Sequence, residues 1–448
     1  MRVLIFHGYM LRGTGSNIYN ANLAPALARL GHEVHLLCQD REVQLEGVQI
    51  HNPDIGGLLP VYVRDPYEGF EVKTFPEMSE AELGRYIEAN VAAVRAVAEG
   101  AGGIDAALAN HLVMGPPILA RAGVAPFAAK IHGSALEYTV KPHPRFLPYA
   151  QEGMEAASGV LIGSAHTAES LWATLSDDLP DLREKTRLGP PGVDVGEFRP
   201  RGDREKLVAF VGKLIVSKGV DLLLAAWPLV RAAHPEARLE VAGFGAYEEG
   251  LRRLLAALER GDLDDAREVA RLGWALEGGE ERPLPILSAF LADPPAGYAE
   301  MARAAAGSVG FVGRLEHHEV ASFFPRAEAM VMPSTFPEAF GMVAVEAAAC
   351  GTLPVSAGHS GMLEVSRQLQ SSLPPEVGSM TSFPVAAGAV EAIAERLSAW
   401  LSLPEGEREQ ARAALVETVA RLWSWEGVAR GVLAAAAGKL DDLPRPAA

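Results

Sequence analysis

The chain has 448 residues, and this length predicts two domains because single hydrophobic cores stop growing at about 250–300 residues. Its hydrophobic fraction of 49% is ordinary for a globular protein, and its net charge of -17 argues against nucleic acid as the main partner. The two cysteines, Cys38 and Cys350, support neither a disulfide framework nor a zinc motif. With no leader pattern and no apolar run of about 18 residues, we expect a cytoplasmic protein without a transmembrane segment, and peripheral contact with a membrane stays open.

The first half of the sequence alternates short apolar runs with helical patterns. Such alternation predicts right-handed crossovers and a mostly parallel sheet in an α/β domain. A helix is expected over residues 17–30, where the periodicity stops at Gly31. Residues 52–76 are rich in proline, glycine and aromatic residues, and we expect them to form loops over one sheet edge. Strands are predicted at residues 3–6, 33–37, 106–109, 127–131 and 160–162.

The alternation restarts near residue 207 and predicts a second doubly wound domain. Prolines and glycines cluster over residues 190–204, so the predicted domains are residues 1–195 and 200–420. A helix is expected at 220–233, and strands at 207–211, 238–242, 309–312, 329–332 and 353–355. Open α/β sheets bind ligands beyond the carboxyl ends of their strands, which predicts a cleft where the two domains face each other.

Two further segments stand apart from this alternation. Residues 259–300 carry ten acids and four arginines and are predicted to be a surface insertion, either a helical excursion or a mobile flap. A last helix, within about residues 420–440, is expected to pack back on the first domain, and the proline-rich tail after it is expected to be disordered.

The most informative motif places Glu338 and Glu346 eight positions apart, with Phe340, Gly341 and Met342 between them at the start of a helical pattern. A loop that leads into a helix directs several backbone N–H groups at one point, which suits a phosphate. A carboxylate one or two turns into that helix can accept hydrogen bonds from a pair of hydroxyls, such as a sugar or a ribose carries. The motif predicts a clamp for a phosphorylated sugar; the alternative is an ordinary strand–loop–helix unit with two surface glutamates.

A second motif places Lys213 and Lys218 on either side of a strand-to-helix loop. Two cations beside a helix N-terminus favour an anion, because the charges and the helix dipole act together. The alternative is a pair of solvated lysines. The loop follows the first strand of the second domain, so it is expected to open onto the predicted cleft.

The first domain offers weaker candidates. Gly13-Thr14-Gly15 allows a sharp turn and a close backbone approach to a ligand, although Ile18 stands where a dinucleotide fingerprint needs its last glycine, which disfavours nicotinamide binding. His132 ends a predicted strand and is expected to point toward the cleft, with a structural histidine as the alternative. Asn110 and His111 end the preceding strand in the same way and are candidates for contact with an acceptor.

With these motifs the chain resembles the retaining glycosyltransferases of family 4, over nearly its full length apart from residues 259–300. The resemblance implies the GT-B fold, in which two doubly wound Rossmann-like domains face each other across a cleft. Further likeness lies in Pro191-Gly192-Val193-Asp194, which resembles the family's interdomain segment. Three departures are Lys213, where most members have arginine, Pro191, where asparagine is usual, and the loop over residues 358–361, which lacks the usual adjacent glycines.

The resemblance also implies roles for the residues that match. Glu338 would contact the hydroxyls of the donor sugar, Glu346 would hold the ribose, and the backbone of Phe340, Gly341 and Met342 would meet the sugar and the diphosphate. His132 would contact the transferred sugar, and Lys218 would bind phosphate beside Lys213. Gly13 and Gly15 would lie near the donor phosphates and the acceptor.

The implied reaction moves a hexose from a UDP-, GDP- or ADP-sugar to an acceptor hydroxyl, with retention at the anomeric carbon. The nucleotide-sugar is a substrate, and neither a cofactor nor a metal is expected, because lysines and a helix dipole can neutralise the diphosphate. The catalytic set would be His132, Lys218 and Glu338, with Glu338 positioning the sugar and not acting as a nucleophile. The alternatives are a GT-B relative such as a nucleotide-sugar epimerase or a phosphorylase, and a non-catalytic protein that binds sugar nucleotides.

Overall fold

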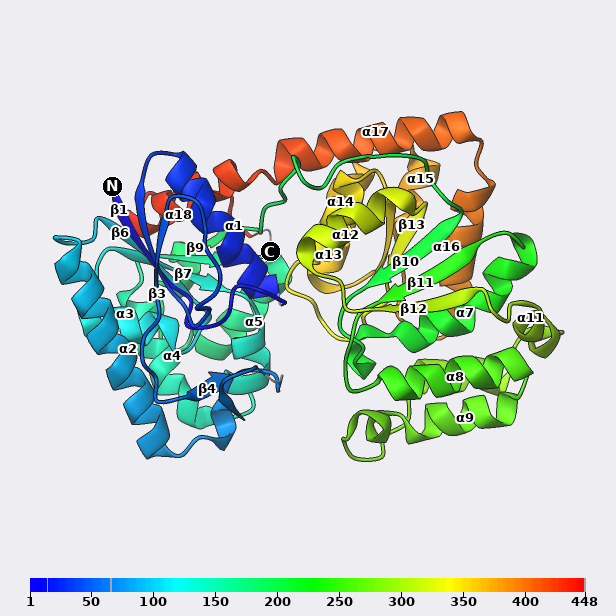
Figure 1. Cartoon of the computed structure of the whole chain (residues 1–448), viewed down its shortest axis with the longest axis horizontal. Coiled ribbons are helices and arrows are strands. Elements are labelled where there is room, and N and C mark those ends of the chain that lie inside the picture. The colour runs from blue at the N-terminus through cyan, green and yellow to red at the C-terminus, as the bar shows by residue number, and fades with distance from the viewer. Residues whose placement is uncertain (14, 65–66, 447–448) are drawn as a thin grey trace. The chain divides into compact units, whose positions relative to one another are not determined.

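The computed structural model describes residues 1–13, 15–64 and 67–446. The chain divides into two compact units (Figure 1). Unit 1 comprises Met1–Gly192 together with Trp423–Ala448, and unit 2 comprises Val193–Leu422. Each unit is built on a parallel sheet with helices on both faces, so the α/β class predicted from the alternating pattern is confirmed.

Unit 1 contains a seven-stranded sheet in the order β3-β2-β1-β6-β7-β8-β9. All its pairs are parallel, and Val3 of the third strand, β1, pairs with Val34 on one side and Ala106 on the other. The strands are β1 (Arg2–Phe6), β2 (Glu33–Leu37), β3 (Val48–His51), β6 (Ala106–Asn110), β7 (Phe127–Ile131), β8 (Gly159–Ile162) and β9 (Thr186–Leu188).

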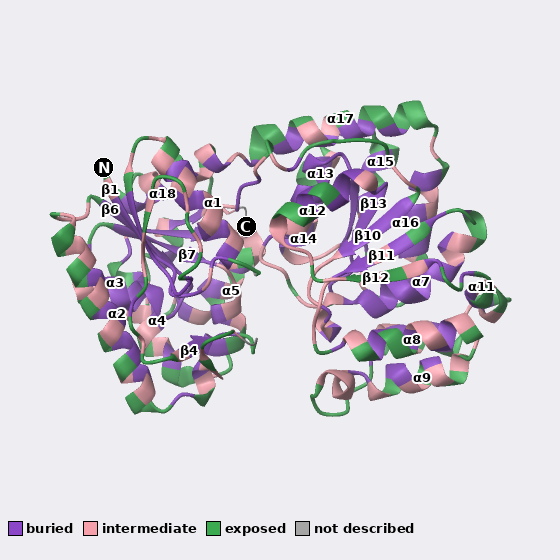
Figure 2. Cartoon of the chain, viewed as in Figure 1, coloured by how far each residue is buried: buried purple, intermediate pink, exposed green. Residues whose placement is uncertain are grey.

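Both faces of this sheet are buried, as Figure 2 shows in purple. Val3 and Ile5 of β1 face one helical layer, while Leu4 and Phe6 face the other, because successive side chains of a strand alternate between faces. The first layer holds α1 (Gly15–Arg29) and α18 (Trp425–Ala436). The second holds α2 (Glu80–Gly100), α3 (Gly115–Ala122), α4 (Leu147–Ala156), α5 (Ala165–Leu175) and α6 (Leu182–Lys185).

Two expectations for unit 1 are wrong. Residues 52–76 are not only loops, because β4 (Leu58–Val61) and β5 (Glu71–Thr74) pair in parallel as a small separate sheet. The end of the chain is not disordered as far as residue 446. Leu440 and Leu443 pack against the core under α1 and α18, and the Leu188 N–H donates to the carbonyl oxygen of Pro444 at 2.8 Å.

Unit 2 contains a six-stranded parallel sheet in the order β12-β11-β10-β13-β14-β15. Its strands are β10 (Leu207–Val211), β11 (Arg238–Ala242), β12 (Val309–Gly313), β13 (Ala329–Met332), β14 (Leu353–Ala357) and β15 (Ser382–Phe383). Its main helices are α7 (Val220–Ala233), α12 (His317–Phe323), α13 (Met342–Ala349), α14 (Ser360–Gln370), α15 (Pro375–Met380), α16 (Ala389–Ser402) and α17 (Glu405–Leu422). Helix α7 packs against α16, and α13 packs against α17.

Residues 259–300 form ordered helices that pack on unit 2. Helix α8 (Glu248–Arg260) leads into α9 (Leu263–Leu272), a 3-10 turn η5 (Trp274–Glu277), α10 (Pro285–Ala292) and α11 (Tyr298–Ala304). The Tyr298 hydroxyl donates to the carbonyl oxygen of Ala225 in α7 at 2.7 Å, and the Leu284 N–H donates to Ala270 at 2.8 Å. The segment is thus a helical excursion tied to the core of unit 2.

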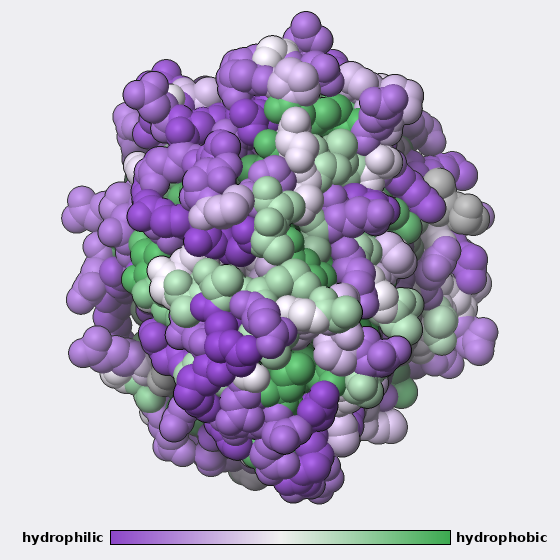
Figure 3. Space-filling view, turned by 90° about the vertical axis from the view of Figure 1, so that its right-hand side faces the viewer, coloured by the Kyte–Doolittle hydropathy of each residue, from purple (hydrophilic) through white to green (hydrophobic). Residues whose placement is uncertain are grey.

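Hydrophilic residues predominate around a narrower apolar band on the face shown in Figure 3. Among the described residues, the exposed large hydrophobic ones are scattered along the chain: Met1, Val63, Tyr138, Val195, Val312 and Leu422. In the same part of the chain no helix has the length and apolar character needed to cross a membrane.

Candidate functional site

The structure brings Lys218 and Glu338 into direct contact in unit 2. Lys218 closes a short 3-10 turn, η4 (Val216–Lys218), between β10 and α7, and its Nζ donates to Oε1 of Glu338 in an ion pair. The hydroxyl of Ser334 donates to the same carboxylate oxygen at 2.9 Å. Each partner of the ion pair keeps 23% of its side-chain surface exposed, so both remain accessible to a ligand.

Backbone contacts hold together two loops of unit 2: the lysine loop, over residues 212–219, and the loop that carries Glu338. The Thr335 N–H donates to the carbonyl oxygen of Ser217 at 2.9 Å. A Cβ atom at Gly219, whose φ is +65°, would lie 2.1 Å from the carbonyl oxygen of Pro333. Only glycine permits both this φ and this approach, so Gly219 sets the distance between the lysine loop and the loop that carries Glu338.

A third loop, over residues 358–361, supports the Glu338 loop from behind. His359 Nε2 donates to the Ser334 carbonyl oxygen at 2.8 Å, and its Nδ1 forms a hydrogen bond with the Ser360 hydroxyl at 3.1 Å. The same hydroxyl accepts from the Glu338 N–H at 3.0 Å. The Gly361 N–H donates to the Glu338 carbonyl oxygen at 2.9 Å. Although it lacks adjacent glycines, this loop therefore fixes the backbone on both sides of Glu338.

Glu346 lies on α13, the helix that follows this loop. Gly341, at φ 99°, caps the N-terminus of the helix, Met342 is its first residue, and Phe340 before it is buried. Glu346 is 5% exposed, and His317 Nε2 lies 2.9 Å from its Oε1. Burial opposes a charged imidazole, but the hydrogen bond to Glu346, its charge and the charges of other nearby carboxylates together outweigh that effect and raise the pKa of His317. His317 was not predicted, because nothing near it in sequence marks it as a partner of Glu346.

Lys213 lies two residues beyond the end of β10, at the start of the lysine loop. The loop is anchored just after it, where the Leu214 N–H donates to the Phe244 carbonyl oxygen at 2.8 Å. A Cβ atom at Gly245 would lie 2.3 Å from the Leu214 carbonyl oxygen, so the loop after β11 is in close contact with the lysine loop.

In unit 1 the glycine loop joins the sheet through polar side chains. Gly13 is exposed with φ 93°, Gly15 begins α1, and Thr14 lies outside the described residues. The Asn17 amide donates to the Arg12 carbonyl oxygen at 2.7 Å, and its Oδ1 accepts from His7 Nε2 at 2.9 Å. One hydrogen-bond network therefore connects His7, which follows β1, to the glycine loop.

The same network reaches His132, which directly follows β7. Asn20 and Asn110 exchange hydrogen bonds through their amides at 2.9 and 3.2 Å, and Asn110 also donates to the Phe6 carbonyl oxygen at 3.1 Å. Asn110 Oδ1 can only accept, so His132 Nε2, at 2.8 Å, must donate to it. Burial lowers the pKa of His132 well below its ordinary range, and His111 and Lys130 add to this effect. His132 is therefore a neutral imidazole whose Nδ1 carries no proton.

Asn110 and His111, the candidates for acceptor contact, are both buried. Asn110 uses its amide within the network and thereby orients His132. His111 adopts φ 68° and packs between the rings of Tyr62 and His132, with centroids at 4.6 and 4.9 Å. Neither ring nitrogen of His111 has a hydrogen-bond partner among the residues that the structure describes.

We expect Lys130, which is 2% exposed on β7, to make the stability of unit 1 depend on pH. Its Nζ donates to the Gly189 carbonyl oxygen above the Tyr19 ring, and burial lowers its pKa to about 7. From about pH 7 to pH 10 the unfolded chain keeps this proton and the folded chain does not, so the free energy of unfolding rises by about 1.4 kcal/mol per pH unit. Urea unfolding of the wild type and Lys130→Met across this range should show that difference in slope.

The control for this experiment is Lys439→Met, which removes an exposed lysine from the same unit and should leave the pH dependence unchanged. Parallel stability curves for the wild type and Lys130→Met would contradict the expectation.

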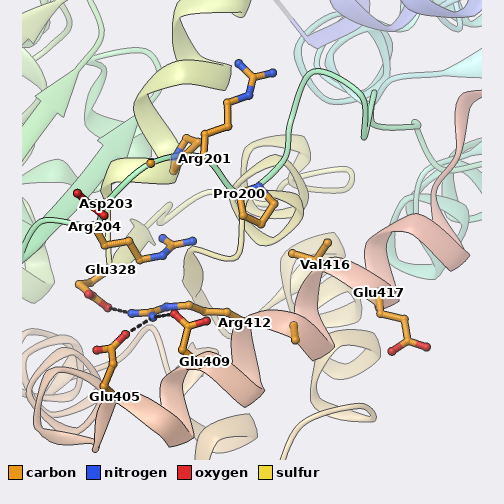
Figure 4. Close-up of a pocket in the computed structure, with 13 residues that line it drawn as sticks. Pro200, Arg201, Asp203, Arg204, Glu328, Glu405, Glu409, Arg412, Val416 and Glu417 are labelled. Atoms are coloured by element: carbon orange, nitrogen blue, oxygen red, sulfur yellow. Dashed lines mark hydrogen bonds and ion pairs between the residues drawn. The ribbon is translucent and has the colours of Figure 1, made fainter.

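A separate pocket of about 770 Å³ lies on unit 2, along α17 and the segment over residues 200–204 (Figure 4). Its charged wall is centred on Arg412, which donates to Glu328 Oε2 and Glu405 Oε1, both at 2.6 Å, and to Glu409. None of the candidate residues discussed above is among the described residues that line it. The pocket is therefore distinct from the Lys218–Glu338 site.

Two Rossmann-like units in one chain, each built on a parallel sheet, make up the GT-B fold. Residues 13–197 match the family model described as Glycosyltransferase Family 4, and residues 197–262 and 301–416 match the one described as Glycosyl transferases group 1. The D-inositol 3-phosphate glycosyltransferase of Frankia alni is 31% identical over 78% of this chain and 78% of its own length. The chain belongs to family 4 of the glycosyltransferases, and the resemblance seen in its motifs is confirmed.

Another relative matches over a shorter segment. The D-inositol 3-phosphate glycosyltransferase of Segniliparus rotundus is 31% identical over 56% of this chain, and the match spans only 46% of that protein. Among solved structures, Anabaena HepE in complex with UDP and glucose is similar with a TM-score of 0.61 and 14% identity, over 99% of this chain and all of that one. At this identity the structural likeness concerns the fold alone.

Proposed function

We propose that this glycosyltransferase moves a hexose from a nucleoside-diphosphate sugar to an acceptor hydroxyl with retention at the anomeric carbon. The contact between Lys218 and Glu338 carries the proposal. It places a cation that can bind a phosphate beside a carboxylate that can accept hydrogen bonds from sugar hydroxyls. Both lie beyond the carboxyl ends of adjacent parallel strands, β10 and β13, where open α/β sheets bind their ligands.

Charge explains why a diphosphate suits this place. As the bond to the sugar breaks, the diphosphate gains negative charge, which Lys213, Lys218 and the N–H groups at the start of α13 would stabilise. A bound diphosphate would compete with Glu338 for Lys218 and would thereby free a carboxylate oxygen for a sugar hydroxyl. No metal cofactor is needed in this scheme, and Glu338 orients the sugar without becoming a nucleophile.

Glu346 would hold the ribose of the donor. Its carboxylate is fixed by His317 through Oε1, so the second oxygen is the one placed to accept from a hydroxyl. In unit 1, His132 would accept a hydrogen bond from a sugar hydroxyl through its unprotonated Nδ1, while Gly13 and Gly15 allow the backbone close to the ligand. Two relatives are D-inositol 3-phosphate glycosyltransferases, so a phosphorylated polyol is the first acceptor to test.

Thermal denaturation with UDP-, GDP- and ADP-sugars tests the donor. The cognate donor should stabilise the fold by about 2.7 kcal/mol at one hundred times its Kd. A panel of hydroxyl acceptors with that donor, read by NMR of the anomeric proton, should then show a product with the donor's configuration. EDTA should leave the rate unchanged. A chain that none of the donors stabilises, or a product with inverted configuration, would contradict the proposal.

A further inference from the structure

The helical excursion of unit 2 contacts the lysine loop through one carboxylate. Glu277 Oε2 accepts a hydrogen bond from the backbone N–H of Val216 at 2.7 Å. Val216 is the first residue of η4, the turn that Lys218 completes. Glu277 belongs to residues 263–300, the stretch that separates the two parts of the chain matched by the Glycosyl transferases group 1 model.

This hydrogen bond satisfies a group that the turn itself leaves open. The first N–H groups of a helical turn have no partner within it, and a carboxylate is a strong acceptor for them. The turn η4 has only three residues and therefore few hydrogen bonds of its own. One of them runs from the Lys218 N–H to the Ile215 carbonyl oxygen at 3.0 Å. An external partner at Val216 therefore restricts the conformation of the segment from which the Lys218 side chain reaches Glu338.

Glu277 is itself held in a defined place. It ends η5, whose first residue, Trp274, donates through its N–H to the Arg282 carbonyl oxygen at 3.1 Å. The Arg282 guanidinium stacks over the Trp274 ring at 4.1 Å from the ring centroid. Gly278 follows at φ 89°, and its N–H donates to Ala275 at 3.1 Å, which closes the turn. The carboxylate thus belongs to a braced element and not to a free loop.

We propose that Glu277 is a positioning residue for the lysine loop, and that the helical excursion serves to bring this carboxylate to Val216. The inference rests on the proposed function of that loop in binding the donor diphosphate. A carboxylate near the diphosphate costs electrostatic energy, so its hydrogen bond, and not its charge, is what favours binding. Glutamine keeps the acceptor oxygen without the charge and therefore replaces Glu277, whereas alanine does not.

The test compares Glu277→Ala and Glu277→Gln with the wild type by calorimetric titration of UDP, GDP and ADP. We expect Glu277→Ala to weaken binding of the cognate nucleotide about tenfold and Glu277→Gln to stay within about threefold of the wild type or bind more tightly. Hydrogen exchange should show a faster amide at Val216 in Glu277→Ala alone. Glu280→Ala, an exposed glutamate of the same excursion, is the matched control and should change neither measurement.

The outcomes separate this inference from the proposed function. A wild type that binds none of the three nucleotides overturns the proposed function. A wild type that binds, together with folded Glu277→Ala that binds equally well, overturns the role of Glu277 and leaves the proposed function standing. Equal weakening by alanine and glutamine likewise overturns the role of the hydrogen bond.

Discussion

Replacement of Lys218 by alanine is expected to lower the turnover of sugar transfer by about 10²–10³, the usual effect of removing one preorganised group that stabilises developing negative charge. Lys218 forms an ion pair with Glu338, and the loss of its ammonium removes a positive charge that would stabilise the leaving diphosphate. The fold should survive, because the side chain is partly exposed and the backbone contacts of its loop are unaffected. Steady-state kinetics with the cognate donor would measure the effect.

The matched control is Lys206→Ala in the same unit. Lys206 also forms an ion pair, with Glu236, but both side chains are about half exposed, and Lys206 precedes β10 and so lies at the opposite end of the strand from the lysine loop. The turnover of the Lys206→Ala protein should stay near that of the wild type. A folded Lys218→Ala protein with near-normal turnover would exclude Lys218 from the site.

Arg412→Ala should cost unit 2 about 3–5 kcal/mol of unfolding free energy, because it leaves a buried carboxylate without its main partner. Glu328 is 4% exposed and accepts from Arg412 at 2.6 Å, and the other cation close to it, Arg408, lies at 3.7 Å. Two more carboxylates, Glu405 and Glu409, pair with the same guanidinium but are largely exposed and can be solvated by water. Urea unfolding of the wild type and the variant would measure the loss.

A second variant separates the buried charge from simple loss of packing. Replacing both Arg412 and Glu328 by methionine removes the unpaired charge, so it should cost less than Arg412→Ala alone. Arg421→Ala, at an exposed position of the same helix, serves as the surface control. A loss below about 1 kcal/mol for Arg412→Ala would show that Glu328 finds another partner or a proton.

The parts of the fold that could be predicted are those with strong local signals. Strands such as β10 are buried on both faces and so read as continuous apolar runs. The edge strands β3 and β9 were missed because their sequences, Val-Gln-Ile-His and Thr-Arg-Leu, are short and mixed in polarity. Strand β4 was missed because it contains Pro60, which argues against a strand when only the sequence is known.

The residues of the candidate site also fall into those that the sequence could predict and those that it could not. Lys218 and Glu338 could be assigned to one ligand because each follows a buried strand in the same domain, and parallel strands bring their carboxyl ends to one edge. Their supporting residues could not be predicted. Val216 and Glu277 are 61 positions apart, and His317 and Glu346 are 29 apart, and neither Glu277 nor His317 belongs to a motif. Such contacts depend on tertiary packing, which local patterns do not encode.

The position of α18 has a consequence for synthesis of the chain. This helix, made after the whole of unit 2, covers the face of the unit 1 sheet that carries Val3 and Ile5. At about 5–20 residues per second, a ribosome needs on the order of 10–50 s to make the intervening unit. The nascent first unit therefore waits for that time with the part of this apolar face under α18 uncovered, where chaperones and proteases can reach it. Deletion of Trp425–Ala436 would make that immature state permanent.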